Sequence, residues 1–255
     1  MLAAAFDASG HEADQPVMVV AGFISSAADW ASFSKEWYKR LSKDDLPYFH
    51  MREILKWNVP ESQRRALFGD LMTIIKDHAY RKFGMAIVTR LTSRISHADK
   101  LRWYLGAYSL AGRACANDVY KWVARERIPS PVACFFEEGD LGAGLLRDGM
   151  IQDGFPPPVF LPGKKPRKTQ DGTIVRHFLP LQAADFIAAE YFMYVSNEIR
   201  KSGKRSNVRW GFLEFEKMAG EVYAIDNRGS ESWLKLLEMS KRIDELIRQH
   251  KRGNH

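Results

Sequence analysis

Residues 3–23 read Ala-Ala-Ala-Phe-Asp-Ala-Ser-Gly-His-Glu-Ala-Asp-Gln-Pro-Val-Met-Val-Val-Ala-Gly-Phe. Apolar residues dominate both ends of this stretch. Its middle, residues 9–16, is polar and contains glycine and proline, which favour turns. We therefore predict two strands, Ala3–Asp7 and Val17–Phe23, that pair as a hairpin. Asp7 is expected at the end of the first strand.

A second apolar run, Val132-Ala-Cys-Phe-Phe-Glu137, also ends in an acid. An uninterrupted apolar run of this length is typical of a buried strand. We expect this strand to lie beside Ala3–Asp7 in one sheet. The apolar stripe over 101–125, which includes Tyr108, indicates core packing. Apolar spacing predicts two further strands, over 84–91 and over 159–161, the second at an edge of the sheet. It also predicts a short helix within the loop 139–158. Longer helices are expected over 29–41, 60–80, 101–125, 181–199 and 232–250.

The order of these elements predicts an α/β fold in which helices flank a mixed β-sheet. We assign residues 1–255 to a single domain, with a helical insertion at about 29–80 and a C-terminal helical extension at about 205–255. The chain of 255 residues is 45% hydrophobic and 27% charged, which excludes a wholly disordered protein.

The sequence also argues against a membrane or secreted protein. No apolar run approaches the roughly 18 residues of a membrane-spanning helix, and the N-terminus lacks the basic region of a signal peptide. The two cysteines, Cys115 and Cys134, belong to no C-x-x-C pair, which argues against a disulfide framework and a zinc knuckle. We therefore expect a cytoplasmic protein with no membrane partner, and the sequence leaves its oligomeric state open.

The formal net charge of +7 is concentrated in one region. Residues 160–209 hold ten Lys and Arg but four Asp and Glu. Such a patch would attract a polyanion such as DNA or RNA, whereas in the alternative interpretation it is a set of solvated loops. The candidate contacts to a phosphate backbone are Lys164, Lys165, Arg167, Lys168, Arg200, Lys204 and Arg205.

Three acids occupy positions where packing does not explain a carboxylate: Asp7 and Glu137 at strand ends, and Asp185 on a helix face of small apolar residues. If the two strands are neighbours and the helix crosses their ends, the three carboxylates converge. Converging carboxylates suit the hard cations Mg²⁺ and Mn²⁺, and two such ions about 3.5–4 Å apart can cleave a phosphodiester. In the alternative interpretation, Asp7 caps the turn that follows it and Asp185 pairs with an arginine.

His50, followed by Glu53, is a further candidate for this site. An imidazole there could act as a general base, donate to a phosphate or bind a metal. The alternative is a histidine that is hydrogen-bonded within a loop.

Four short motifs carry a resemblance to a known family. They are Phe6-Asp7-Ala8-Ser9-Gly10 followed by Val19–Phe23, Phe49-His50-Met51-Arg52-Glu53, Phe136-Glu137-Glu138-Gly139-Asp140, and Leu181-Gln182-Ala183-Ala184-Asp185-Phe186. Together, and in this order, they resemble the DUF3800 family. That family is related to the ribonuclease H-like fold, in which strand-end acids and a helix acid bind Mg²⁺ for nucleic-acid cleavage. The resemblance implies a ribonuclease H-like domain whose metal ligands and catalytic residues are Asp7, Glu137 and Asp185, with His50 as a further catalytic residue.

The sequence departs from the family pattern at one position. Ala8 stands where the family usually has glutamate. Alternation along a strand predicts that residue 8 faces away from Asp7, in which case the loss is harmless. Glu12 or Glu53 could otherwise substitute for the missing carboxylate.

Three functions are compatible with these observations. The first is a divalent-metal-dependent nuclease or related phosphodiesterase that acts on nucleic acid. The second is a catalytically inactive nucleic-acid-binding protein of the same fold, which Ala8 favours. The third is a metal-dependent phosphohydrolase of a small molecule. The sequence does not separate DNA from RNA, or endonuclease from exonuclease activity.

Overall fold

The structure is a computed structural model that describes residues 1–11, 14–162, 166–168, 174–175, 178–201 and 209–225. These residues belong to the compact unit Met1–Ala224, and a second unit, Ile225–His255, begins with the last of them. The helix predicted over 232–250 lies outside the described residues. Within the described part of the chain, no helix has both the length and the hydropathy needed to cross a membrane.

A six-stranded mixed sheet forms the centre of the first unit, in the order β5-β4-β1-β2-β3-β8. Antiparallel pairing joins β1, β2 and β3, whereas β4 runs parallel to both β1 and β5. The predicted α/β class with a mixed sheet is therefore confirmed. The strands are β1 (Leu2–Ser9), β2 (Val17–Ser26), β3 (Arg81–Val88), β4 (Val132–Glu137), β5 (Val159–Leu161) and β8 (Gly220–Ile225).

The two sequence predictions about strand pairing are confirmed. β1 and β2 form the expected hairpin, with Asp7 opposite Ala21. β1 and β4 are neighbours in one sheet, and their parallel register places Phe6 opposite Phe136. Because each of these phenylalanines is followed directly by an acid, the parallel register brings Asp7 and Glu137 to the same edge of the sheet.

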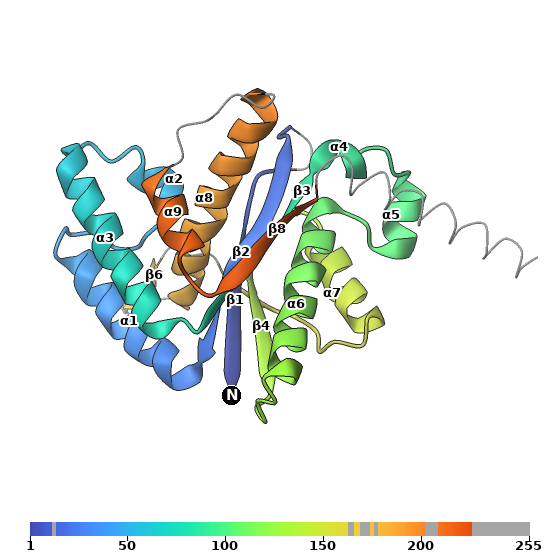
Figure 1. Ribbon diagram of the computed structural model, residues 1–255, viewed down its shortest axis with the longest axis horizontal. Coiled ribbons are helices and arrows are strands. Elements are labelled where there is room, and N and C mark those ends of the chain that lie inside the picture. The colour runs from blue at the N-terminus through green and yellow to red at the C-terminus, as the bar shows by residue number, and fades with distance from the viewer. Residues whose placement is uncertain (12–13, 163–165, 169–173, 176–177, 202–208, 226–255) are drawn as a thin grey trace, which may run out of the picture. The chain divides into compact units, whose positions relative to one another are not determined.

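Helices cover both faces of the sheet (Figure 1). α8 packs against β1 and β2 on one face, where α1 and α3 also lie, and α6 packs against β2 and β3 on the other. A two-stranded ribbon of β6 (Arg167–Lys168) and β7 (Ile174–Val175) stands apart from the main sheet. The helices are α1 (Ala27–Ser42), α2 (Met51–Ile54), α3 (Glu61–His78), α4 (Thr89–Thr92), α5 (His97–Trp103), α6 (Ala107–Arg125), α7 (Ala143–Gln152), α8 (Pro180–Lys201) and α9 (Trp210–Glu216).

Small residues allow the strands of the central hairpin and the helix α8 to pack closely together. Gly22 of β2 lies so close to β1 that a Cβ atom there would stand 1.8 Å from the carbonyl oxygen of Ala5. Ala183 and Ala184 of α8 are fully buried, which permits the helix to approach the sheet closely. The apolar face of α8 therefore sets how near Asp185, one residue later, comes to the strand ends.

Several elements differ from the sequence predictions. The strand expected over 84–91 ends at Val88, and the short helix α4 follows it. The strands β6 and β7 were not predicted. The single helix expected over 101–125 is two helices, because the backbone at Tyr104 is left-handed (φ 56°) and ends α5, and α6 then begins after Gly106. Apolar spacing that continues across the break concealed it. The strand β8 was not predicted, since residues 205–255 were expected to be helical. Of that range, the described residues form α9 and β8.

Candidate functional site

A cavity of about 740 Å³ opens where β1 and β4 end. Four segments build its walls: the end of β1, the end of β4 with the loop after it, the start of α2, and the middle of α8. Every acid and the histidine proposed from the sequence as catalytic residues lie in these walls. The Asp, Glu, His and Arg residues of the wall are Asp7, His11, Asp14, His50, Arg52, Glu137, Glu138, Asp140 and Asp185.

The three predicted carboxylates differ in exposure. Asp7 is 4% exposed and Asp185 is 7% exposed, whereas Glu137 is half-buried. Burying carboxylates is costly unless donors or cations compensate, so their gathering around one cavity indicates a functional site. Over the described residues, no three His, Cys, Asp or Glu side chains are arranged as a ready metal site. A shared metal site for Asp7, Glu137 and Asp185 therefore stays a prediction.

Hydrogen bonds to the N-terminal part of α8 hold the segment around His50 at the site. The side-chain carbonyl of Gln182 accepts hydrogen bonds from the backbone N–H of Phe49 (2.9 Å) and from the Trp37 indole N–H (2.8 Å). One turn later, a carboxylate oxygen of Asp185 accepts from the backbone N–H of Met51 (2.6 Å). The residues on either side of His50 are thus both held by α8, which fixes where the imidazole enters the cavity.

His50 itself has a polar atom without a protein partner. The side chain is half-buried and lines the cavity, and its Nδ1 atom is shielded from water with no hydrogen bond. Buried polar atoms in native proteins nearly always have a partner. A ligand, ion or water in the cavity could supply one, which fits a role at the site better than a loop histidine satisfied by its own segment.

Tyr108 of α6 is a residue of this region that sequence reasoning assigned to core packing. It is 2% exposed, its ring packs edge-on against Phe136, and its hydroxyl is buried with no hydrogen-bond partner. Burial raises the pKa of this phenol, and the negative charges of Asp140, Asp7 and Glu137 raise it further. Tyr108 is therefore a neutral donor beside the acids. An apolar helix stripe carries no sequence signal that could have revealed it.

Ala8 occupies the position at which the DUF3800 pattern usually has glutamate. Ala8 is one of the residues that line the same cavity as Asp7. Glu53 is exposed, accepts a hydrogen bond from the Tyr48 hydroxyl, and is not part of the cavity wall. Glu12 lies outside the described residues. Glu138 and Asp140, which follow β4, supply additional carboxylates instead.

The basic residues predicted to hold a phosphate backbone are largely beyond what the structure describes. Lys164, Lys165, Lys204 and Arg205 lie outside the described residues, and for Arg167 and Lys168 the backbone alone is described. Arg200 is exposed near the end of α8 and does not line the cavity. Two other basic side chains, His11 and Arg52, do line it.

Comparison with protein-family models finds no match, and comparison with curated proteins finds none either. The resemblance to the DUF3800 family therefore stays a prediction that rests on the four motifs. The structure does bring all four motifs to one place: each contributes at least one residue to the wall of the cavity.

Proposed function

We propose that this protein is a divalent-metal-dependent nuclease or related phosphodiesterase that acts on nucleic acid. The observation that carries the proposal is that Asp7, Glu137 and Asp185, from two parallel strand ends and a crossing helix, line one cavity together with His50. Carboxylates from separate elements in one cleft are the donor set that Mg²⁺ and Mn²⁺ prefer.

The donor set fits such a cation. Asp7, Glu137 and Asp185 would hold it, and when bound it supplies activation of water and neutralisation of a phosphate. The chain's own groups have complementary tasks. His50 Nδ1 can accept a hydrogen bond from the attacking water or from a protonated phosphate oxygen. The Tyr108 hydroxyl can donate a hydrogen bond to an oxygen atom of the site. Arg52 adds positive charge at the cavity wall, and His11 adds a further nitrogen that can form a hydrogen bond with a phosphodiester there.

The ribonuclease H-like assignment is part of this proposal. It requires the first strand and the acid-ended strand to be neighbours, and β1 and β4 are paired in parallel. It also requires a helix acid to reach the strand ends, and Asp185 lines the cavity at that edge. Both observations support the assignment.

The direct test is cleavage in the presence of defined cations. The full chain is incubated with single-stranded DNA, double-stranded DNA and RNA in Mg²⁺, Mn²⁺ or a chelator, and cation binding is measured by calorimetry. We expect cation binding, and cleavage that depends on Mg²⁺ or Mn²⁺. If instead small phosphate monoesters or nucleotides alone are hydrolysed, the protein is a small-molecule phosphohydrolase.

A second candidate function is that of a nucleic-acid-binding protein of the same fold without catalysis. Two observations favour it: Ala8 leaves the cavity wall without the family's glutamate, and the described residues contain no ready metal site. Salt-sensitive binding of DNA or RNA, without cation binding or cleavage, would select this function over the first.

A further inference from the structure

A second cavity, of about 550 Å³, lies beside the acidic one. Residues of α3, α8 and α9 line it together with Leu55 and Arg209, and Figure 1 shows these helices together on one face of the sheet. Leu55, which follows α2, lines both cavities. We refer to it as the arginine pocket, after Arg64, Arg65 and Arg209 in its wall.

In the described part of the chain, Arg64 makes no ion pair with a carboxylate, although Glu61 and Glu190 also line the pocket. Its Nη2 group donates to the carbonyl oxygen of Trp57 (2.8 Å), and its Nε–H is shielded from water without an acceptor. The neighbouring cations are paired: Arg65 contacts Glu61 at 3.1 Å on the surface, and Arg209 contacts Glu190. A partly buried guanidinium with unused donors is a site for an anion, above all a phosphate.

The same pocket presents an aromatic surface. Trp210 is 48% exposed, although it is one of the largest apolar side chains, and it stands in the pocket wall near Phe68 and Leu55. Its backbone position is fixed by its neighbours on both sides. Arg209 makes a two-pronged ion pair with Glu190, which is 1% exposed, at 2.9 and 3.0 Å. Gly211 packs so closely on Glu190 that a Cβ atom there would lie 2.8 Å from its carboxyl carbon.

An exposed tryptophan beside an arginine is the combination that holds a single-stranded nucleotide, with the base on the indole and the phosphate on the guanidinium. A base-paired duplex would not offer its base faces.

We infer that the arginine pocket binds a nucleotide of a single-stranded DNA or RNA segment that continues into the neighbouring acidic cavity. The inference deepens the proposed function by naming single-stranded nucleic acid as the substrate class, and its position relative to the acids rests on that function. Binding in the pocket needs neither a metal nor cleavage.

The test is therefore made in a chelator, by fluorescence anisotropy of a labelled 12-nucleotide single strand with the full chain. Trp210→Ala should weaken binding by between about fivefold and about a hundredfold, the range expected for loss of one stacked base, and Trp210→Phe should restore most of it. Arg64→Gln should reduce the salt slope of binding by about 0.7, the value for one lost phosphate contact on a single strand.

Arg125→Gln is the matched control. Arg125 also lies with a tryptophan, Trp122, in the wall of a separate cavity of about 330 Å³. Arg125→Gln removes one positive charge, as Arg64→Gln does. Equal losses for Arg64→Gln and Arg125→Gln would mean a general charge effect and would overturn the inference. So would unchanged affinity of Trp210→Ala, or a wild-type protein that binds duplex but no single strand. Failure of cation-dependent cleavage alongside the expected pocket effects would instead reject the nuclease proposal and leave the pocket in place.

Discussion

At the scale of single residues, Asp185 combines two tasks that one substitution separates. Its carboxylate accepts the Met51 N–H and lines the acidic cavity. Asparagine keeps an acceptor oxygen for Met51 but removes the negative charge. We expect Asp185→Asn to reduce cation-dependent cleavage by on the order of a thousandfold or more, because metal-assisted hydrolysis derives most of its rate from the ion. Turnover and thermal unfolding are measured on the same preparations, and an active variant would remove Asp185 from the mechanism.

Tyr108 allows a test in which stability and function move in opposite directions. Its buried hydroxyl has no hydrogen-bond partner, so Tyr108→Phe should leave stability unchanged or raise it by about 1 kcal/mol. If the hydroxyl serves the neighbouring acids, the same variant should lower cation affinity or cleavage by about tenfold to a hundredfold, as supporting groups of metal sites do.

Tyr191→Phe provides the matched control for Tyr108. The Tyr191 side chain is also buried, but its hydroxyl donates to Glu216, and neither of these residues lines the acidic cavity. We expect this control to lose stability by about 1 kcal/mol and to keep full cleavage. A loss of stability without loss of function in Tyr108→Phe would return Tyr108 to the role of a core residue.

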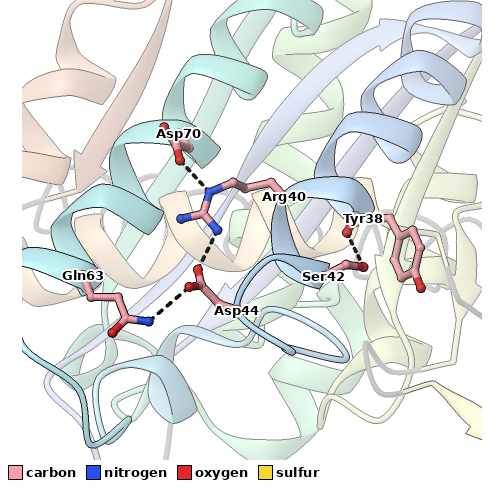
Figure 2. A network of polar contacts seen from close by, with 6 residues as sticks. All are labelled: Tyr38, Arg40, Ser42, Asp44, Gln63 and Asp70. Atoms are coloured by element: carbon pink, nitrogen blue, oxygen red, sulfur yellow. Dashed lines mark hydrogen bonds and ion pairs between the residues drawn. The ribbon is translucent and has the colours of Figure 1, made fainter.

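At the scale of elements, α1 and α3 are joined by a polar network around a buried arginine (Figure 2). Arg40, 8% exposed, donates from Nε to Asp70 (2.5 Å) and from Nη1 to Asp44 (2.6 Å), and Gln63 donates to the other oxygen of Asp44 (3.1 Å). Arg40→Met should destabilise the protein by about 1–3 kcal/mol, because it leaves the Asp44 carboxylate, 13% exposed, without its strongest donor. Denaturant unfolding measures the change.

Asp70→Asn tests the same network from its exposed side. The Asp70 side chain is 57% exposed, so solvent screens its attraction to Arg40. The expected cost is below about 1 kcal/mol, as for other surface ion pairs. If both substitutions cost the same, burial would not determine the strength of this network.

The elements also show which parts of the fold the sequence could reveal. β1, β2 and β4 were predictable because uninterrupted apolar runs have few other uses, and the acids that end β1 and β4 followed from them. β8 was not predictable, because Val222 packs against a residue that is distant in the sequence. It lies so close to Gly84 of β3 that a Cβ atom on Gly84 would be 2.9 Å from a Val222 methyl group. A local pattern does not contain such a contact.

The sequence also revealed only part of the candidate site. It could not reveal the residues whose roles depend on contacts between distant segments. The acids and His50 stand out because charged or polar side chains interrupt apolar runs or follow them. The hydrogen bond between Gln182 and Phe49 joins residues 133 positions apart, and the charges of the acids act on the Tyr108 hydroxyl only after α6 packs on the opposite face of the sheet. Both depend on tertiary packing.

At the scale of the whole molecule, acidification should unfold the protein through carboxylates that are held ionised in the folded state. Hydrogen bonds from Tyr80 and Ser26 lower the pKa of Asp29. Burial raises the pKa of Asp44, but hydrogen bonds from Arg40 and Gln63 outweigh it, so that this pKa is also lowered. A carboxyl whose pKa is lower in the folded than in the unfolded state contributes stability above the unfolded pKa, and this contribution is lost as the pH falls through the folded value.

We therefore expect the melting temperature to be nearly constant above about pH 5 and to fall steeply below about pH 4, where carboxyls of unfolded chains take up protons. Asp44→Asn should be less stable at neutral pH and should show a shallower fall on acidification, because it has one carboxylate fewer to protonate. Melting curves at matched ionic strength between about pH 3 and pH 7 measure both effects. Parallel curves for the two proteins would mean that Asp44 has the same pKa folded and unfolded, and that the Arg40 network gives no pH-dependent stability.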